Sequence, residues 1–266
     1  MTLHLKQGKG GKWHFGQRSE LLQWGYMSKT SAPRFHVLVP CAGTGSRAGT
    51  AIPKQYQVVA GQTMVMHTLQ TLSRVAQLSS GWVILSPEDP FNWPSVAWPA
   101  HFRRVHCGGT NRAQSVFNGL SAMRQSGLFD HDWVLVHDAA RCLITPSAVE
   151  QLIETCREDL VGGLLALPLP DTLKLQTIDA QGARVASTVP REDKWLAQTP
   201  QMFRLGALHE ALAQAAKNGF EGITDESSAM ERQGFSPRLV PGSAQNLKIT
   251  YPADFAFAEA VLKGQT

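Results

Sequence analysis

From Phe35 onward, short apolar runs alternate with segments of helical periodicity, and this alternation constrains the fold more than any other feature of the chain. The runs predict strands that are buried on both faces, at residues 37–39, 82–85, 133–136 and 164–167. Helical patterns lie between them, near residues 63–77, 112–125 and 146–158. A strand, a helix and a further strand in this order form a right-handed crossover between parallel strands. The sequence therefore predicts an α/β fold with a doubly wound, mostly parallel, Rossmann-like sheet.

Residues 171–191 break this rhythm. Leu173, Leu175 and Ile178 lead into a polar turn at residues 179–182, and Val185 follows in a second run. This pattern predicts a β-hairpin. Because a lone hairpin with an uncovered apolar face is marginally stable in water, we expect an arm that projects from the sheet and packs on a partner subunit.

The remaining segments complete one domain at residues 35–266. After the arm we expect helices near 205–217 and 225–233, a short strand at residues 247–250 and a closing helix from Pro252. Residues 1–34 have no steady period and predict a flexible basic extension. Because Met27 directly precedes the first ordered-looking segment, it is an alternative start.

Composition excludes several classes of protein. The chain is 43% hydrophobic and 17% charged, which excludes wholesale disorder, and no apolar run is long enough to span a bilayer. The net charge is +4, but a start at Met27 would lower it to +1, so nucleic acid is an unlikely partner. A basic, aromatic-containing arm that binds RNA remains an alternative. The four cysteines have no zinc spacing and there is no signal peptide, which together favour a cytoplasmic protein.

A Gly-rich loop follows the first predicted strand. It runs from Pro40 to Arg47 and is followed by Lys54. Small residues let backbone N–H groups approach phosphate oxygens, and the two cations can neutralise phosphate charge. The alternative is a tight strand-to-helix turn with two solvated cations.

Two common nucleotide-binding motifs do not explain this loop. Gly43-x-Gly45-x-x-Ala48 satisfies the dinucleotide fingerprint, but no acidic residue occurs between Glu20 and Glu88 to bind a ribose. The Walker pattern is absent as well. The loop instead fits a nucleotidyltransferase, in which a phosphate attacks the α-phosphorus of a nucleoside triphosphate and pyrophosphate leaves.

Eight blocks of sequence, in order, carry a resemblance to a known family. The first blocks are Pro40-x-Ala42-Gly43-x-Gly45-x-Arg47 with Pro53-Lys54-Gln55-Tyr56, Gly108-Gly109 with Arg112-x-x-Ser115-Val116, and Val136-His137-Asp138-Ala139-Ala140-Arg141. The others are Asp171-Thr172 and residues 188–191, 198–201, 223–226 and 246–250. Over residues 35–263 the chain resembles the 2-C-methyl-D-erythritol 4-phosphate cytidylyltransferases of the non-mevalonate isoprenoid pathway.

The resemblance implies transfer of CMP from CTP to 2-C-methyl-D-erythritol 4-phosphate, dependence on Mg²⁺, and a homodimer with interlocking arms. Catalytic roles fall on Arg47, Lys54, Arg191 and Lys248. The nucleotide-binding residues would be Ala42, Gly43, Gly45, Gly109, Arg112 and Ser115. The substrate-binding residues would be Asp138, Arg141, Thr172 and Thr224, with Thr172 and Arg191 reaching the neighbouring subunit's acceptor from the arm.

Several of these residues also have structural explanations. Asp138, the candidate Mg²⁺ ligand, could cap a turn, and Lys248 could be an edge-strand charge. The sequence departs from the family pattern at Thr110 and Gln245, where many members carry Asp. Two other functions remain open: a cytidylyltransferase for another alditol phosphate such as ribitol 5-phosphate, and a non-catalytic nucleotide- or RNA-binding protein.

Overall fold

The structure is a computed structural model that describes residues 32–43, 52–89, 91, 93 and 98–264. The chain divides into two units, Met1–Ala32 and Pro33–Thr266. The description below concerns the second unit. The expected extension at residues 1–34, with Met27, lies almost wholly outside the described residues.

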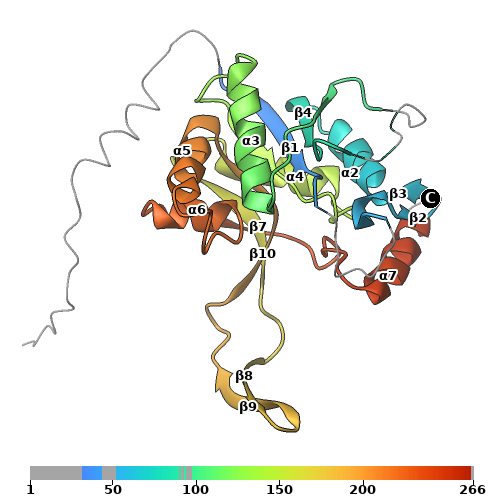
Figure 1. Cartoon of the computed structure of the whole chain (residues 1–266), viewed down its shortest axis with the longest axis vertical. Helices are drawn as coiled ribbons and strands as arrows, with labels where there is room; N and C mark the ends of the chain where they lie inside the picture. The colour runs from blue at the N-terminus through green and yellow to red at the C-terminus, as the bar shows by residue number, and fades with distance from the viewer. Residues whose placement is uncertain (1–31, 44–51, 90, 92, 94–97, 265–266) are drawn as a thin grey trace, which may run out of the picture. The chain divides into compact units, whose positions relative to one another are not determined.

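A seven-stranded sheet forms the centre of this unit (Figure 1). Its strands, in the order β11-β7-β10-β6-β1-β4-β5, are β11 (Arg238–Pro241), β7 (Gly162–Pro168), β10 (Trp195–Arg204), β6 (Trp133–Val136), β1 (Phe35–Pro40), β4 (Leu78–Ile84) and β5 (Phe102–Val105). β1 pairs in parallel with β4 and β6, β4 with β5, and β7 with β11. The predicted α/β fold with a mostly parallel sheet is confirmed.

Helices cover both faces of the sheet. They are α2 (Met64–Ser73), α3 (Arg112–Gln125), α4 (Pro146–Cys156), α5 (Leu205–Ala216), α6 (Glu226–Arg232) and α7 (Pro252–Lys263). On β1, Val37 and Val39 belong to the core formed with α2 and α4, whereas Leu38 belongs to the core formed with α3, α5 and α6. This alternation follows from the two-residue period of a strand, and it explains why the central strands are apolar on both faces. No helix in the described part of the chain is long and apolar enough to cross a membrane.

Side-chain caps set where three of these helices begin. The Asn111 side chain accepts a hydrogen bond from the Gln114 N–H at 2.8 Å, and α3 starts at the next residue. Thr145 caps α4 directly before a proline, and Asp225 caps α6. Each cap satisfies a backbone donor that would otherwise lack a partner in the first turn.

The structure corrects two expectations. The segment predicted as a strand at residues 247–250 is not one, because its backbone pairs with another backbone at a single point, from the Ile249 N–H to the Ala140 carbonyl at 2.9 Å, and forms no ladder. The sequence analysis also missed β10, which runs antiparallel to both β6 and β7. Its centre is polar and contains Pro200, so it lacks the apolar pattern of the other central strands.

The hairpin between β7 and β10 forms as predicted. β8 (Leu173–Asp179) and β9 (Gly182–Val189) pair in a sheet of their own, with Gly182 at φ +120° in the turn. The register shifts between Leu175 and Gln176, where β9 contributes an extra residue. β8 has no extra residue, so its side chains alternate between the two faces without interruption. Ile178 comes three residues after Leu175 on β8, and the two side chains therefore point to opposite faces. The hairpin therefore carries apolar residues on both faces, and not on one face as expected.

Candidate functional site

A cavity with a volume of about 540 cubic ångströms opens where β1 and β6 end and α3 begins. The lining residues include eight of the predicted site residues: Ala42, Gly43, Lys54, Gly109, Arg112, Ser115, Asp138 and Lys248. Gly45 and Arg47 lie in residues 44–51, outside the described residues. Ligands of open α/β sheets bind at the carboxyl ends of strands, so the position of the cavity agrees with the fold.

Close backbone packing shapes one wall of this cavity. The Gln55 side-chain amide donates to the carbonyls of Cys41 and Gly43 at 3.0 and 2.8 Å, which ties the turn η2 (Lys54–Tyr56) to the loop after β1. Opposite that loop, a Cβ on Gly108 would lie 2.3 Å from the Ala42 Cβ. Only glycine allows the two loops to approach this closely.

Asp138 is the centre of the charged groups in the cavity. Its Oδ1 accepts from the Arg112 Nε at 2.8 Å, and its Oδ2 accepts from the Lys248 Nζ at 2.7 Å. Burial by itself would raise the pKa of Asp138, but the charges of Arg112 and Lys248 outweigh it and hold the pKa well below its usual range. Asp138 is therefore an anion that holds two cations at the cavity wall.

The two lysines of the cavity come from distant parts of the chain. The Lys54 Nζ donates to the Ile249 carbonyl at 2.9 Å, so Lys54 is held by the residue that follows Lys248. The segment wrongly predicted as a strand thus brings both lysines to the cavity. Both lysines, expected as catalytic residues from the resemblance, therefore line one cavity.

His137, which precedes Asp138, is a structural residue. It is fully buried, with Nδ1 3.1 Å from the Thr199 hydroxyl and Nε2 3.3 Å from the Arg141 carbonyl. Burial lowers the pKa of His137 to about 4, so the imidazole is neutral at pH 7. The Thr199 hydroxyl also accepts from the Asp138 N–H at 3.0 Å and so supports the backbone of that residue.

Four predicted residues do not line this cavity. Arg141 donates to the carbonyls of Asn246 and Ala197, and its buried Nε has no partner among the described residues. Thr172 and Arg191 are exposed at the base of the hairpin, where Arg191 donates to the Pro170 carbonyl. Thr224 lines a second cavity, with a volume of about 220 cubic ångströms, between α3, α5 and α6.

Sequence reasoning missed one charged residue next to the site. Glu226 is buried at the start of α6 and receives two hydrogen bonds from Arg112, at 2.7 and 3.0 Å. It stood in one of the recognised blocks, residues 223–226, and this was the only signal for it. Thr110, a departure from the family pattern, lines the larger cavity and bonds to the Gln114 side chain through both its N–H and its hydroxyl.

Residues 35–264 match the family described as 2-C-methyl-D-erythritol 4-phosphate cytidylyltransferase. The enzyme of that name from Chromobacterium violaceum is 52% identical over 226 residues, which are 85% of this chain and 96% of the relative. The bifunctional enzyme IspD/IspF of Albidiferax ferrireducens is 56% identical over 87% of this chain, and the match covers 54% of that longer protein.

Solved structures give the same result. The 2-C-methyl-D-erythritol 4-phosphate cytidylyltransferase of Francisella tularensis is 31% identical and superposes with a TM-score of 0.71, over 85% of this chain and 99% of that one. A 4-diphosphocytidyl-2C-methyl-D-erythritol synthase is 35% identical with a TM-score of 0.74, over 87% and 100% of the two chains. Sequence and fold agree, and the chain belongs to the 2-C-methyl-D-erythritol 4-phosphate cytidylyltransferase family.

Proposed function

We propose that this cytidylyltransferase uses the cavity at the ends of β1 and β6 to transfer CMP from CTP to 2-C-methyl-D-erythritol 4-phosphate, in isoprenoid precursor biosynthesis. One observation carries the assignment of the cavity. Lys54, Arg112 and Lys248, from three distant segments, line the same space at the carboxyl edge of the sheet. A triphosphate needs such a concentration of positive charge.

The nucleotide would lie along the loop after β1. Main-chain groups and small side chains of Ala42, Gly43, Gly109 and Ser115 bound the space where the cytidine fits, and their close packing favours a pyrimidine over a larger purine. The triphosphate would then lie near Lys54. Arg47 and Gly45, by the family pattern, would contribute from the same loop.

The reaction needs positioning and charge neutralisation more than a covalent intermediate. A phosphate oxygen of the acceptor forms a bond to the α-phosphorus of CTP, and the bond from that phosphorus to the bridging oxygen of the β-phosphate breaks. Pyrophosphate leaves with the bonding electron pair. Lys54 would neutralise charge on the triphosphate in the transition state, and Lys248 would do so on the acceptor side, with Asp138 and Arg141.

Mg²⁺ fits this site if the phosphates supply most of its ligands. Asp138 is the one carboxylate among the described residues that line the cavity, and each of its oxygens accepts one hydrogen bond while retaining a further lone pair. Mg²⁺ is commonly held by one or two carboxylates together with substrate phosphates. Asp138 would hold the ion, which would neutralise part of the triphosphate charge.

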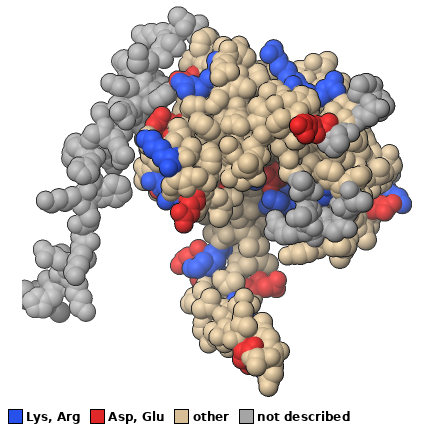
Figure 2. Space-filling view, viewed as in Figure 1, with Lys and Arg blue, Asp and Glu red and all other residues tan. Residues whose placement is uncertain are grey.

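We also propose a homodimer in which the hairpin of one subunit reaches the other. Ile178 and Val185 are 75% and 64% exposed, and the face of the hairpin seen in Figure 2 is mostly uncharged between the charged groups at its base and an acidic group near its tip. A partner surface would cover these side chains. It would also bring Thr172 and Arg191, which lie outside the cavity of their own chain, to the acceptor site of the neighbour.

The four cysteines are unpaired in the structure, which supports the cytoplasm as the place of action.

Release of pyrophosphate from CTP tests the proposal when the acceptor is varied. Turnover with 2-C-methyl-D-erythritol 4-phosphate is the expected result. Turnover with ribitol 5-phosphate alone would keep the chemistry and assign another acceptor. CTP binding without turnover on either acceptor would favour a non-catalytic nucleotide-binding protein.

A further inference from the structure

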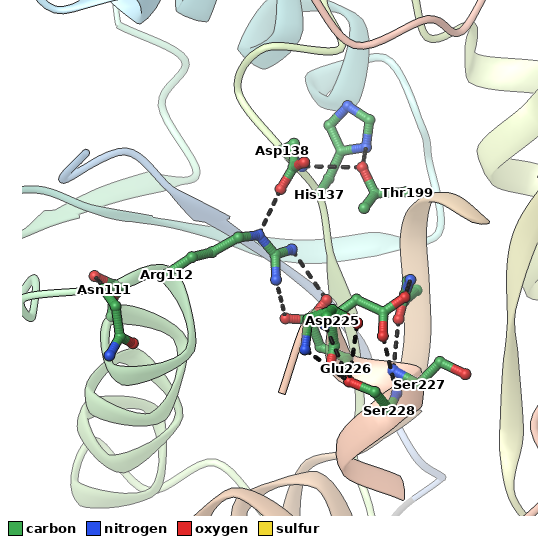
Figure 3. A network of polar contacts seen from close by, with 12 residues as sticks. Asn111, Arg112, His137, Asp138, Thr199, Asp225, Glu226, Ser227 and Ser228 are labelled. Carbon is green, nitrogen blue, oxygen red and sulfur yellow. Dashed lines mark hydrogen bonds and ion pairs between the residues drawn. The ribbon is translucent and has the colours of Figure 1, made fainter. Parts of the chain in front are cut away.

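Four charged side chains form a line that starts in the larger cavity and ends between α3 and α6, and Figure 3 shows three of them, Asp138, Arg112 and Glu226. Their order is Lys248, Asp138, Arg112 and Glu226, and the successive contacts are 2.7, 2.8 and 2.7 Å long. The charges alternate in sign, so the four groups together are neutral. Arg112 uses Nε for Asp138 and both of its terminal nitrogens for Glu226.

Glu226 lies behind Arg112 as seen from the larger cavity. Its side chain is only 2% exposed, and it lines the smaller cavity but not the larger one. Arg112 lines both. Glu226 can therefore influence a ligand in the larger cavity through Arg112 and not by direct contact.

The backbone around Glu226 is fixed to the central sheet. Asp225 caps α6 by accepting from the Ser228 N–H at 2.9 Å, and its other oxygen accepts from the Gln201 side chain of β10 at 2.8 Å. The Gln201 side-chain oxygen accepts in turn from the Ser227 N–H at 2.7 Å. The first turn of α6 is thus tied on both sides of Glu226, which makes its carboxylate a rigid anchor.

We propose that Glu226 is a positioning residue for the nucleotide: its two hydrogen bonds hold the Arg112 guanidinium so that Nε faces Asp138 and the cavity stays open for the triphosphate. Without this anchor, the guanidinium would turn toward Asp138, the other carboxylate that it contacts. It would then compete with Lys248 for the Asp138 oxygens. The proposal rests on the proposed function, because it assumes that CTP occupies this cavity.

The sign of the effect separates positioning from simple electrostatics. Glu226 carries a negative charge near a site for a polyanion, so long-range repulsion between these like charges, taken alone, predicts that removing the charge tightens CTP binding. Loss of positioning predicts weaker binding. The two explanations therefore give opposite results for the same variant.

The test is the affinity of the full chain for CTP, measured by titration calorimetry together with the melting temperature. Glu226→Gln keeps the shape of the side chain but removes its charge and one acceptor. We expect the dissociation constant for CTP to rise about tenfold or more, the value of one charge-assisted hydrogen bond. The matched control is Glu231→Gln, the same change on the exposed part of α6, where the carboxylate accepts from Ser227. It should leave CTP affinity unchanged.

A double variant tests whether Glu226 acts through Arg112. In an Arg112→Lys background, Glu226→Gln should weaken CTP binding little further, because the bidentate pair is already lost. Should Glu226→Gln fold poorly, Glu226→Asp keeps the charge, shortens the reach and should weaken CTP binding in the same direction.

Equal or tighter CTP binding by a folded Glu226→Gln variant would overturn the positioning role and leave the proposed function intact. Additive losses in the double variant would also overturn it. Failure of the wild-type chain to bind CTP would overturn the proposed function, and the positioning role with it.

Discussion

Charged side chains in the larger cavity depend on one another for their geometry. Asp138 holds Arg112 and Lys248, and the backbone next to Lys248 holds Lys54. His137, which stands beside Asp138 in the sequence, is neutral and packed away from the cavity. At this scale the site is a set of fixed cations around one anion, and it contains no poised general base among the described residues that line the cavity.

Lys54→Ala should reduce kcat for CTP turnover about 100-fold or more, because it removes a fixed positive charge from the reacting phosphates. The fold should persist, since Lys54 is only partly buried and lines the cavity. Pyrophosphate release and the melting temperature check both parts.

Lys217→Ala is the matched control for Lys54→Ala, because Lys217 is an exposed lysine at the end of α5 whose amine contacts Gln214. It should leave kcat unchanged. A Lys54→Ala variant that turns over CTP at the wild-type rate would remove Lys54 from the reaction.

How far the sequence predicts the site depends on the residue. Lys54, Asp138 and Lys248 were predictable because their blocks follow strands or match the family pattern. Glu226 was not, because it pairs with a residue 114 positions away, and no local pattern reports such a contact. The place of Arg141 was also unpredictable, since its partners are backbone carbonyls from two other segments.

At the scale of elements, helices were predicted more accurately than strands. α3 has the predicted bounds of 112–125, because Asn111 marks its start and its apolar positions repeat with the helical period. β5 and β11 were missed because each has four residues and carries exposed charges at the edge of the sheet. β10 was missed because its buried glutamines and threonine are satisfied by tertiary hydrogen bonds, which a hydrophobic pattern does not show.

A buried carboxylate joins the starts of β1 and β6, on the side of the sheet away from the cavity. Asp132 accepts from the Arg34 N–H at 2.9 Å and from the Phe129 N–H at 3.0 Å, and the His36 Nε2 lies 3.5 Å away. Burial would raise the pKa of Asp132, but the neighbouring His36 side chain and the hydrogen bonds from Arg34 and Phe129 outweigh it and hold the pKa below its usual range.

Asp132→Asn should therefore lower the free energy of unfolding at pH 7 by about 2 to 4 kcal/mol. A depressed pKa in the folded state stabilises the fold above the ordinary Asp pKa of about 3.9, and this stability is lost as the pH falls through the folded-state value. The free energy of unfolding of the variant should therefore fall less than that of the wild type as the pH falls. Urea unfolding at a series of pH values from 7 to 3 measures this difference.

Asp130→Asn is the control for Asp132→Asn, since Asp130 pairs with Arg124 in a partly exposed ion pair and should change stability by less than about 1 kcal/mol. Equal stability of the Asp132→Asn variant and the wild type at pH 7 would contradict the role given to the buried carboxylate.

At the scale of the whole molecule, the hairpin links the fold to the proposed dimer. Replacing Leu175 and Ile178 together by Asp should convert a dimer into a monomer, because the charges would be buried against the partner. Leu160→Asp is the control, because Leu160 lies outside the hairpin and is 74% exposed, about as much as Ile178 at 75%. Sedimentation velocity at assay concentration distinguishes the species. A wild-type monomer, or a hairpin variant that stays dimeric, would contradict the shared-site arrangement.

The most direct test of the central claim is pyrophosphate release from CTP, ATP, GTP and UTP, each with 2-C-methyl-D-erythritol 4-phosphate as acceptor. The cavity wall at Ala42 and Gly109, with Gly108 packed closely against Ala42, predicts turnover with CTP and little with either purine nucleotide. Equal turnover with ATP or GTP would contradict the nucleotide site described here, and no turnover with any nucleotide would contradict the proposed function.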